Sequence, residues 1–258
     1  MNVRTFLWFL GQPPLYREML RRLAWSAVTP RTRRSYRERQ KLLSREWCAA
    51  SVHNPDESSR ELGLSGDLPS VAVLHPAAWK NAELAARTCP VRMGGPGAVD
   101  LLYHACLHLH AERVVETGVA YGWSSLAILL ALEATQQGSL VSIDMPYVLR
   151  GNSGQVGCVV PDALRKRWTL VRRPDRDALP KVLQGMTPID LAHYDSDKSE
   201  RGRAFGYAML WSALRPGGWL ISDDIHDNLA FRLFSEQVSR KPVVLPGRDG
   251  SYVGILKK

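Results

Sequence analysis

After residue 95, short β-branched runs alternate with segments of helical periodicity, and this alternation constrains the fold more than any other feature. Strands are predicted at about Arg113–Glu116, Leu140–Asp144, Thr169–Arg172, Leu191–Tyr194 and Trp219–Ser222, with helices at about 121–135, 161–166, 176–184, 199–213 and 227–238. The pattern predicts an α/β fold, a Rossmann-like doubly wound and mostly parallel sheet. Two later runs, Val243–Leu245 and Tyr252–Leu256, flank the turn GRDG and predict a C-terminal antiparallel hairpin.

The first 94 residues lack this alternation and consist of arginine-rich helical patterns and a polar loop. We therefore expect residues 1–94 to form a basic, mainly helical N-terminal extension that acts as a lid or an oligomer contact. Residues 95–258 would form the α/β domain, and the extension could join two copies in a homo-oligomer.

Positive charge is concentrated at the N-terminus. Residues 1–45 contain eleven Lys and Arg against two acidic residues, which accounts for the whole net charge of +9. One apolar set in this segment falls at helical spacing opposite Arg17, Arg21 and Arg22, namely Leu15, Tyr16, Met19, Leu20 and Leu23. Such a basic amphipathic helix can pack against its own domain or a second subunit, the interpretation we favour. It can also lie on an anionic membrane surface or meet an acidic partner.

Neither a membrane span nor a secretory signal is expected. No apolar run approaches the roughly 20 residues that a spanning helix needs, and Pro13 and Pro14 interrupt the apolar opening. The four cysteines have neither zinc nor disulfide spacing, which favours a reducing compartment: Cys48, Cys89, Cys106 and Cys158. We expect a cytoplasmic protein, with a peripheral membrane contact through residues 1–45 as the alternative.

The segment RVVETGVAYGWSS predicts a nucleotide site. A strand ends in Glu116, and the chain then turns through Gly118 and Gly122, which permit positive φ and the close approach of a ligand. Ser124 stands at the start of the next helix, where free N–H groups can hold a carboxylate or a phosphate. Asp144 ends the following strand, the position from which an acid holds ribose hydroxyls.

The spacing of this segment discriminates between cofactors. It reads ExGxxxGxS, whereas dinucleotide-binding turns read GxGxxG. Glu116 would repel a pyrophosphate but suits the ammonium group of a methionine moiety, which favours S-adenosylmethionine over NAD. The alternative is a packing turn in an unrelated α/β protein.

Three acidic residues follow the next two strands: Asp195, and the pair Asp223 and Asp224. Parallel strand ends open on one edge of a sheet, and clustered carboxylates there favour Mg²⁺ or another small divalent cation. A bound metal lowers the pKa of a hydroxyl, and Lys198 or His226 could accept its proton. Alternatively, the aspartates are solvated helix caps.

Together these motifs resemble the class I S-adenosylmethionine-dependent O-methyltransferases, in particular the metal-dependent group of catechol, caffeoyl-CoA and macrocin O-methyltransferases. The resemblance covers about residues 95–258. It implies a methionine site at Glu116, Gly118 and Ser124, and a ribose site at Asp144. It also implies adenine contacts from Asp175 and Arg176, metal ligands at Asp195, Asp223 and Asp224, and Lys198 as the base.

Two departures from this family are visible. Asp224 stands where catechol-type enzymes often have Asn, and is closer to the branch that modifies sugars and antibiotics. RPD replaces the usual GDS step before the adenine contact.

The predicted activity is methyl transfer from S-adenosylmethionine to a hydroxyl of a small molecule, with a sugar, glycoside or natural product favoured as acceptor. A catechol-like phenol is an alternative acceptor. RNA methylation that uses the basic N-terminal segment is a second alternative, against which the nearly neutral catalytic half argues. A non-catalytic member of the family is a third.

Overall fold

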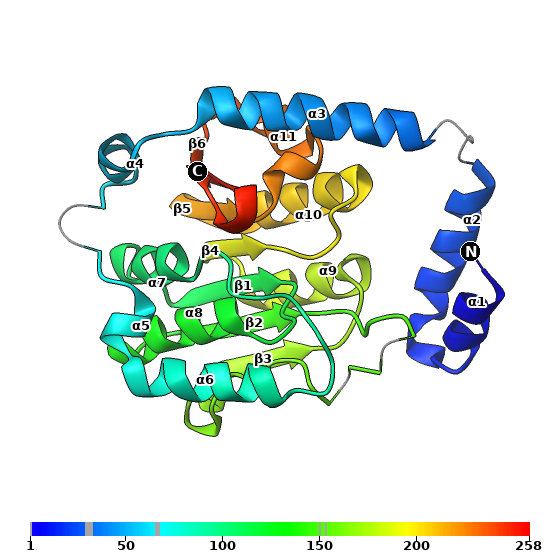
Figure 1. Cartoon of the computed structure of the whole chain (residues 1–258), viewed down its shortest axis with the longest axis horizontal. Coiled ribbons are helices and arrows are strands. Elements are labelled where there is room, and N and C mark those ends of the chain that lie inside the picture. The colour runs from blue at the N-terminus through cyan, green and yellow to red at the C-terminus, as the bar shows by residue number, and fades with distance from the viewer. Residues whose placement is uncertain (1, 29–32, 65–67, 150, 153) are drawn as a thin grey trace.

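A seven-stranded mixed sheet in the order β3-β2-β1-β4-β5-β7-β6 forms the centre of the protein (Figure 1). The structure is a computed structural model that describes residues 2–28, 33–64, 68–149, 151–152 and 154–258. Five strands are parallel: β1 (Arg113–Thr117), β2 (Ser139–Ile143), β3 (Trp168–Val171), β4 (Ile189–Tyr194) and β5 (Leu214–Ser222). Strands β6 (Val243–Pro246) and β7 (Tyr252–Lys257) form the predicted antiparallel hairpin, and β7 pairs with β5. The predicted fold class is confirmed.

The register of the central strands places polar groups side by side. Glu116 on β1 is level with Ser142 on β2 and His193 on β4, and all three are buried. Apolar residues surround this row, including Val115 on β1 and Ala192 on β4, which are 0% exposed. Central parallel strands are covered on both faces, so a polar row within them must find its partners inside the protein.

Helices cover both faces of the sheet. One face packs against α7 (Val99–His108) and α8 (Trp123–Ala134) in a cluster that includes Leu102 and Leu129. The other face packs against α9 (Asp175–Met186), α10 (Glu200–Ala213) and α11 (Ala230–Gln237), through Leu179, Tyr207 and Phe231. The helix expected at 161–166 is the 3-10 helix η2 (Asp162–Arg167).

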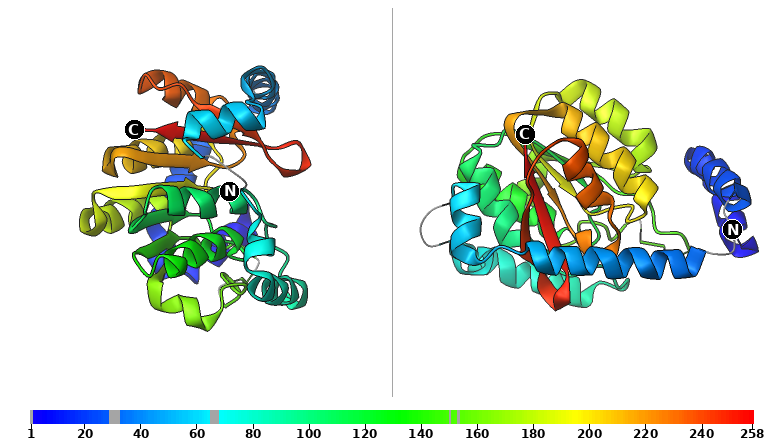
Figure 2. Two further views of the ribbon diagram at one scale, coloured as in Figure 1. Left: turned by 90° about the vertical axis from the view of Figure 1, so that its left-hand side faces the viewer. Right: turned by 90° about the horizontal axis from the view of Figure 1, so that it is seen from above.

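The N-terminal region is helical and consists of α1 (Val3–Leu10), η1 (Pro13–Leu15), α2 (Tyr16–Val28), α3 (Arg33–Ser51), α4 (Pro55–Leu62), α5 (Val71–Leu74) and α6 (Pro76–Thr88). Helix α3 runs along one edge of the molecule (Figure 1 and Figure 2), and its Ser44 hydrogen-bonds the carbonyl of Ile225 in the short helix η3 (Ile225–Asp227). Helices α5 and α6 contribute Val71 and Ala82 to the cluster with α7 and α8. The extension is therefore integrated with the domain, and a boundary at residue 94 stays a prediction.

Helices α1 and α2 lie apart at one end of the molecule (Figure 1). They share a small cluster of Phe9, Leu15 and Met19. Among the described residues, no helix combines the length and the apolar character needed to cross a bilayer.

Candidate active site

Two glycines shape the turn between β1 and α8. Gly118 has φ +84° and Gly122 has φ +95°, which are left-handed values that other residues rarely adopt. A Cβ atom on Gly118 would overlap the backbone carbonyl of Asp195, and one on Gly122 would lie 2.9 Å from the Cα of Gly157. The turn therefore needs glycine for its conformation and for the close approach of neighbouring loops.

Glu116 is enclosed beneath this turn. Ser125 Oγ donates a hydrogen bond of 2.5 Å and Ser142 Oγ one of 2.7 Å to Oε2, while His193 Nδ1 lies 3.2 Å from Oε1. The side chain is 0% exposed. Sequence reasoning assigned this carboxylate to the ammonium group of methionine, but in the structure protein groups already surround it.

His193 connects Glu116 to the acidic residues at the end of β5. Its Nε2 lies 3.7 Å from Oδ2 of Asp223. Burial alone would lower the pKa of His193, but the carboxylates of Asp223 and Glu116 on either side raise it to about 10. Burial alone would raise the pKa of Glu116, but its contact with His193 holds it below the usual value. His193 thus lies between the two carboxylates, whose charges favour its protonated form, and no sequence motif indicates this arrangement.

Asp144 follows β2 and is almost completely buried. Its Oδ2 accepts hydrogen bonds from the backbone N–H groups of Val119 (2.9 Å) and Ala120 (3.0 Å). Its Oδ1 accepts one from Arg172 Nη1 at 2.7 Å. The predicted ribose-binding acid therefore lies against the glycine turn, but Arg172 occupies one of its oxygens.

The side chains of the two residues predicted to contact adenine, Asp175 and Arg176, lie in different surroundings. Asp175 accepts a hydrogen bond from Ser196 Oγ beside the glycine turn, and burial raises the pKa of Asp175 to about 7 although that hydrogen bond opposes the rise. Arg176 instead stacks on Phe205 of α10 and Trp25 of α2, with its guanidinium carbon 4.6 Å and 5.3 Å from the ring centroids. The structure brings Asp175 to the site and directs Arg176 toward the N-terminal helices.

Asp195, Asp223 and Asp224 lie at the carboxyl ends of β4 and β5, and Lys198 lies among them. The ammonium nitrogen of Lys198 is 3.1 Å from Asp195 Oδ1 and also hydrogen-bonds Asp224 Oδ2. Within the described residues, no three His, Cys, Asp or Glu side chains converge closely enough to form a metal site. The three carboxylates share one region, in which Lys198 pairs with Asp195 and Asp224 while His193 lies beside Asp223.

The electrostatics of this region follow from burial and mutual charge. Burial and then the charge of Asp223 raise the pKa of Asp195 to about 6, although Lys198 partly offsets them. Burial would lower the pKa of Lys198, but Asp195 and Asp224 outweigh it and the pKa lies above its usual value. Burial would raise the pKa of Asp224, but Lys198 holds it below the usual range. Lys198 is therefore a firmly charged counter-ion.

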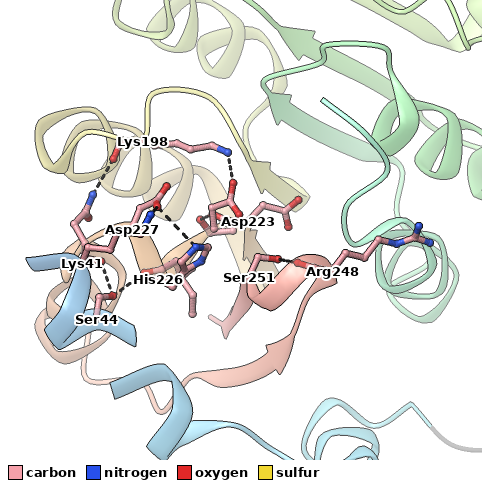
Figure 3. A network of polar contacts seen from close by, with 12 residues as sticks. Lys41, Ser44, Lys198, Asp223, His226, Asp227, Arg248 and Ser251 are labelled. Carbon is pink, nitrogen blue, oxygen red and sulfur yellow. Dashed lines mark hydrogen bonds and ion pairs between the residues drawn. The ribbon is translucent and has the colours of Figure 1, made fainter. Parts of the chain in front are cut away.

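His226 lies in η3, close to the acidic residues (Figure 3). Its Nε2 is 3.8 Å from Asp227 Oδ1, and its Nδ1 has no hydrogen-bond partner among the described residues. Burial lowers the pKa of His226, which favours the neutral imidazole. Helix α3 supports η3 from outside: Ser44 Oγ donates to the Ile225 carbonyl at 2.9 Å, and Lys41 lies 3.5 Å from Asp227.

Sequence reasoning missed two features that hold the acidic residues. Arg203 of α10 is 0% exposed, and its Nη2 donates to the backbone carbonyls of Asp224 (2.7 Å) and Asp223 (3.3 Å). Gly97 packs so closely that a Cβ atom there would lie 2.5 Å from Asp223 Oδ2. The GGPG run containing Gly97 could have indicated such a close approach, whereas Arg203 lies in an ordinary helical pattern.

A cavity of about 650 Å³ opens beside these groups. Residues 94–98 border it from one direction and the β6–β7 hairpin from another. The polar side chains that line it are Asp195, Lys198, Asp223, Asp224, His226, Arg248, Asp249 and Ser251. The cavity thus adjoins the acidic residues and is large enough for a small molecule.

Comparisons with known proteins agree with this architecture. The family model described as "Methyltransferase domain" matches residues 115–225. No curated protein matches the chain in sequence.

Several solved structures share the fold. A candidate caffeoyl-CoA O-methyltransferase from Staphylococcus aureus is 12% identical, over 73% of this chain and 97% of that one, with a TM-score of 0.56. A candidate O-methyltransferase from Klebsiella pneumoniae is 18% identical, over 83% and 98%, with a TM-score of 0.52. The SAH-bound methyltransferase PaMTH1 from Podospora anserina is 14% identical, over 80% and 97%, with a TM-score of 0.51.

At these identities the likeness of the structures concerns the fold, and the family match concerns the segment that holds the glycine turn and the acidic residues. Both agree with the resemblance found in the sequence. Residues 115–225 match the model of a methyltransferase domain, and the chain has the fold that these O-methyltransferase structures share.

Proposed function

We propose that the protein transfers a methyl group from S-adenosylmethionine to a hydroxyl oxygen of a small molecule. The observation that carries the proposal is the meeting of the glycine turn after β1 with the acidic residues after β4 and β5 at one edge of the sheet. Ligands of open α/β sheets bind at the carboxyl ends of the strands. A similar fold in PaMTH1 holds SAH, which supports this choice of cofactor.

The cofactor site follows from the turn. The first turn of α8 offers free backbone N–H groups and Ser124 to the carboxylate of the methionine moiety. Gly118 and Gly122 let the ligand approach the backbone. Asp144 and Asp175 would contact the adenosine moiety, with Arg172 giving up one oxygen of Asp144. Glu116 supports the turn from below and does not hold the ligand directly.

We further propose that a divalent cation, Mg²⁺ or a similar ion, would draw together the side chains of Asp195, Asp223 and Asp224, which share one region of the described structure but do not converge on a single point. Asp223 Oδ1 is buried and has no hydrogen-bond partner within the described residues, so it retains a lone pair for a cation. Three carboxylates are the hard oxygen donors that such ions prefer. When bound, the ion would orient the acceptor oxygen and favour its ionised form.

Residues of the chain would accept the hydroxyl proton, balance the charge of the carboxylates and align the reactants. His226 lines the cavity, and burial favours its neutral form, so we propose that its imidazole takes the hydroxyl proton. Lys198 is engaged by two carboxylates and would balance their charge. Methyl transfer requires the acceptor oxygen, the methyl carbon and the cofactor sulfur to lie in line. The cofactor site at the glycine turn and the adjoining acceptor cavity would hold them in that arrangement.

The acceptor class is proposed from the lining of the cavity. No Phe, Tyr or Trp side chain lines it in the part of the chain that the structure describes, whereas the hairpin contributes Arg248, Asp249 and Ser251. Polar groups of this kind suit a polyhydroxylated acceptor such as a sugar or a glycoside. A catechol-like phenol is the second candidate, and parallel assays with both acceptor classes separate them.

Calorimetric titration of SAH and then Mg²⁺ tests the proposal, with Asp195→Asn and the exposed Asp162→Asn as matched variants. We expect wild type and Asp162→Asn to bind both ligands, and Asp195→Asn to bind SAH but to lose Mg²⁺. SAH binding without Mg²⁺ binding in wild type would remove the metal and keep the methyltransferase. Absence of SAH binding would refute the central proposal.

A further inference from the structure

Helix α1 exposes a continuous apolar stripe. Val3, Phe6, Leu7 and Leu10 follow the spacing i, i+3, i+4, i+7 and are 74%, 37%, 59% and 44% exposed. An adjacent side of the same helix buries Phe9 against α2. The helix therefore has apolar residues both where it meets the protein and where it faces outward, which packing within this chain does not require.

The charges around the stripe are positive. Arg4 on α1 and Arg17 on α2 are exposed. The only acidic residue in the sequence from 2 to 28 is Glu18, which is 8% exposed and pairs with Arg21 (3.0 Å) and Arg22 (2.8 Å). A surface that carries apolar side chains next to unopposed positive charge matches the interface of an anionic bilayer.

The helix pair is positioned to act as an attachment point. Figure 1 and Figure 2 show α1 and α2 at one end of the molecule, outside the layers that surround the sheet. The bidentate pair Arg21–Asp177, at 3.0 Å, and the stacking of Arg176 on Trp25 join α2 to α9. A surface bound by α1 would therefore hold the methyltransferase domain beside it.

We propose that α1 is an interfacial membrane anchor whose stripe of Val3, Phe6, Leu7 and Leu10 enters the headgroup region of an anionic bilayer, with Arg4 and Arg17 on the lipid phosphates. This mode of binding lies in the plane of the membrane and does not cross it. A second copy of the chain could also cover an apolar stripe. The unopposed arginines argue against that occupant, because two copies would bring like charges together.

Vesicle co-flotation of the full chain tests the anchor. The vesicles contain phosphatidylcholine alone, or equal parts of phosphatidylcholine and phosphatidylglycerol. The test variant is Leu7→Ser/Leu10→Ser, and the matched control is Leu84→Ser/Leu233→Ser, which alters leucines that are 59% and 57% exposed on other helices. We expect wild type and the control to bind the anionic vesicles, and the test variant to bind about tenfold more weakly or less.

The charge contribution is tested with Arg4→Gln/Arg17→Gln, which should weaken binding to the anionic vesicles about tenfold or more and leave SAH affinity unchanged. Three outcomes would overturn the anchor: no flotation of wild type, equal flotation with neutral vesicles, or equal loss in the Leu84→Ser/Leu233→Ser control. The first of these outcomes, combined with a dimer that Leu7→Ser/Leu10→Ser converts to a monomer, would assign the stripe to a second copy of the chain. SAH titration of each variant shows separately that the domain is folded and binds the cofactor.

Discussion

At the scale of single residues, Gly118 combines a positive φ with a close contact to the backbone of Asp195, so a substitution there would change both the turn and the site. We expect Gly118→Ala to lower the free energy of unfolding by about 2–4 kcal/mol and to weaken SAH binding, because φ is positive and the added Cβ overlaps the Asp195 carbonyl. Urea denaturation and calorimetry measure the two effects. The control is Gly185→Ala within α9, where a Cβ meets no atom within 4 Å and stability should stay equal or rise. Equal stability of Gly118→Ala and wild type would show that the turn adapts.

The positions of the candidate site residues could be predicted from sequence better than their partners. Spacing after the strands was enough to place Asp195, Asp223 and Asp224 at one edge. It could not show that Glu116 is enclosed by His193 and two serines, because that contact depends on the register between β1, β2 and β4. These strands are parallel and share no hairpin turn, so no local turn geometry in the sequence fixes their register.

At the scale of elements, Asp190 of β4 forms hydrogen bonds at the starts of β1 and β5. Its Oδ2 accepts from the backbone N–H groups of Glu112 and Arg113 at 2.9 Å each, and its Oδ1 contacts Arg215 Nε at 2.5 Å. We expect Asp190→Asn to lower the free energy of unfolding by about 1–3 kcal/mol at neutral pH, since charge-assisted bonds are lost. The exposed Asp162→Asn is the control and should change little.

The same substitution has a defined pH dependence. Burial would raise the pKa of Asp190, but the bonds from Arg215 and from the two backbone N–H groups outweigh it and lower the pKa from 3.8. A depressed folded pKa stabilises the protein above the unfolded pKa, and that stabilisation disappears as the pH falls through the folded value. The difference in unfolding free energy between wild type and Asp190→Asn should therefore be constant above about pH 5 and shrink below pH 4. A difference that grows on acidification would contradict this account.

Helix α10 positions the acidic pair through Arg203, whose Nη2 reaches both backbone carbonyls while its Nη1 reaches Asn228 Oδ1 at 3.4 Å. We expect Arg203→Lys to cost about 2–3 kcal/mol of stability and to weaken Mg²⁺ binding to Asp223 and Asp224, because a lysine has one nitrogen and cannot hold the carbonyls and Asn228 together. Denaturation and metal titration measure the two effects. Arg232→Lys, at an exposed pair with Glu236, is the control. Unchanged metal affinity in Arg203→Lys would exclude a positioning role.

Most elements of the sheet could be predicted because each strand is a short apolar run bounded by turn residues. The exception is β5, which begins at Leu214 and so includes the segment RPGG, which reads as a turn before Trp219. A register irregularity between β4 and β5 accommodates this segment. The packing of α3 against η3 could not be predicted either, since it rests on contacts such as Ser44 with Ile225 that join residues distant in the sequence.

At the scale of the whole molecule, the buried hydrophobic side chains of the described residues form two large clusters and one small one. The large clusters lie on the two faces of the sheet, and their earliest buried member in the described residues is Cys48. The small cluster joins α1 and α2 to Met145 and Val148, next to Asp144. The two large clusters therefore stabilise the α/β domain, whereas the small cluster attaches α1 and α2 to it.

Removal of residues 1–32 tests this division. We expect the shortened chain to stay folded, with Tm lowered by about 2–6 °C, because it loses the Arg21–Asp177 pair and the cover over Met145 while both large clusters remain. SAH affinity should change no more than about threefold, and binding to anionic vesicles should be lost. Differential scanning calorimetry, SAH titration and co-flotation of the same preparation measure the three effects. If the chain unfolded or lost SAH binding, α1 and α2 would be part of the catalytic domain, and the basic helices could not be a separable attachment to it.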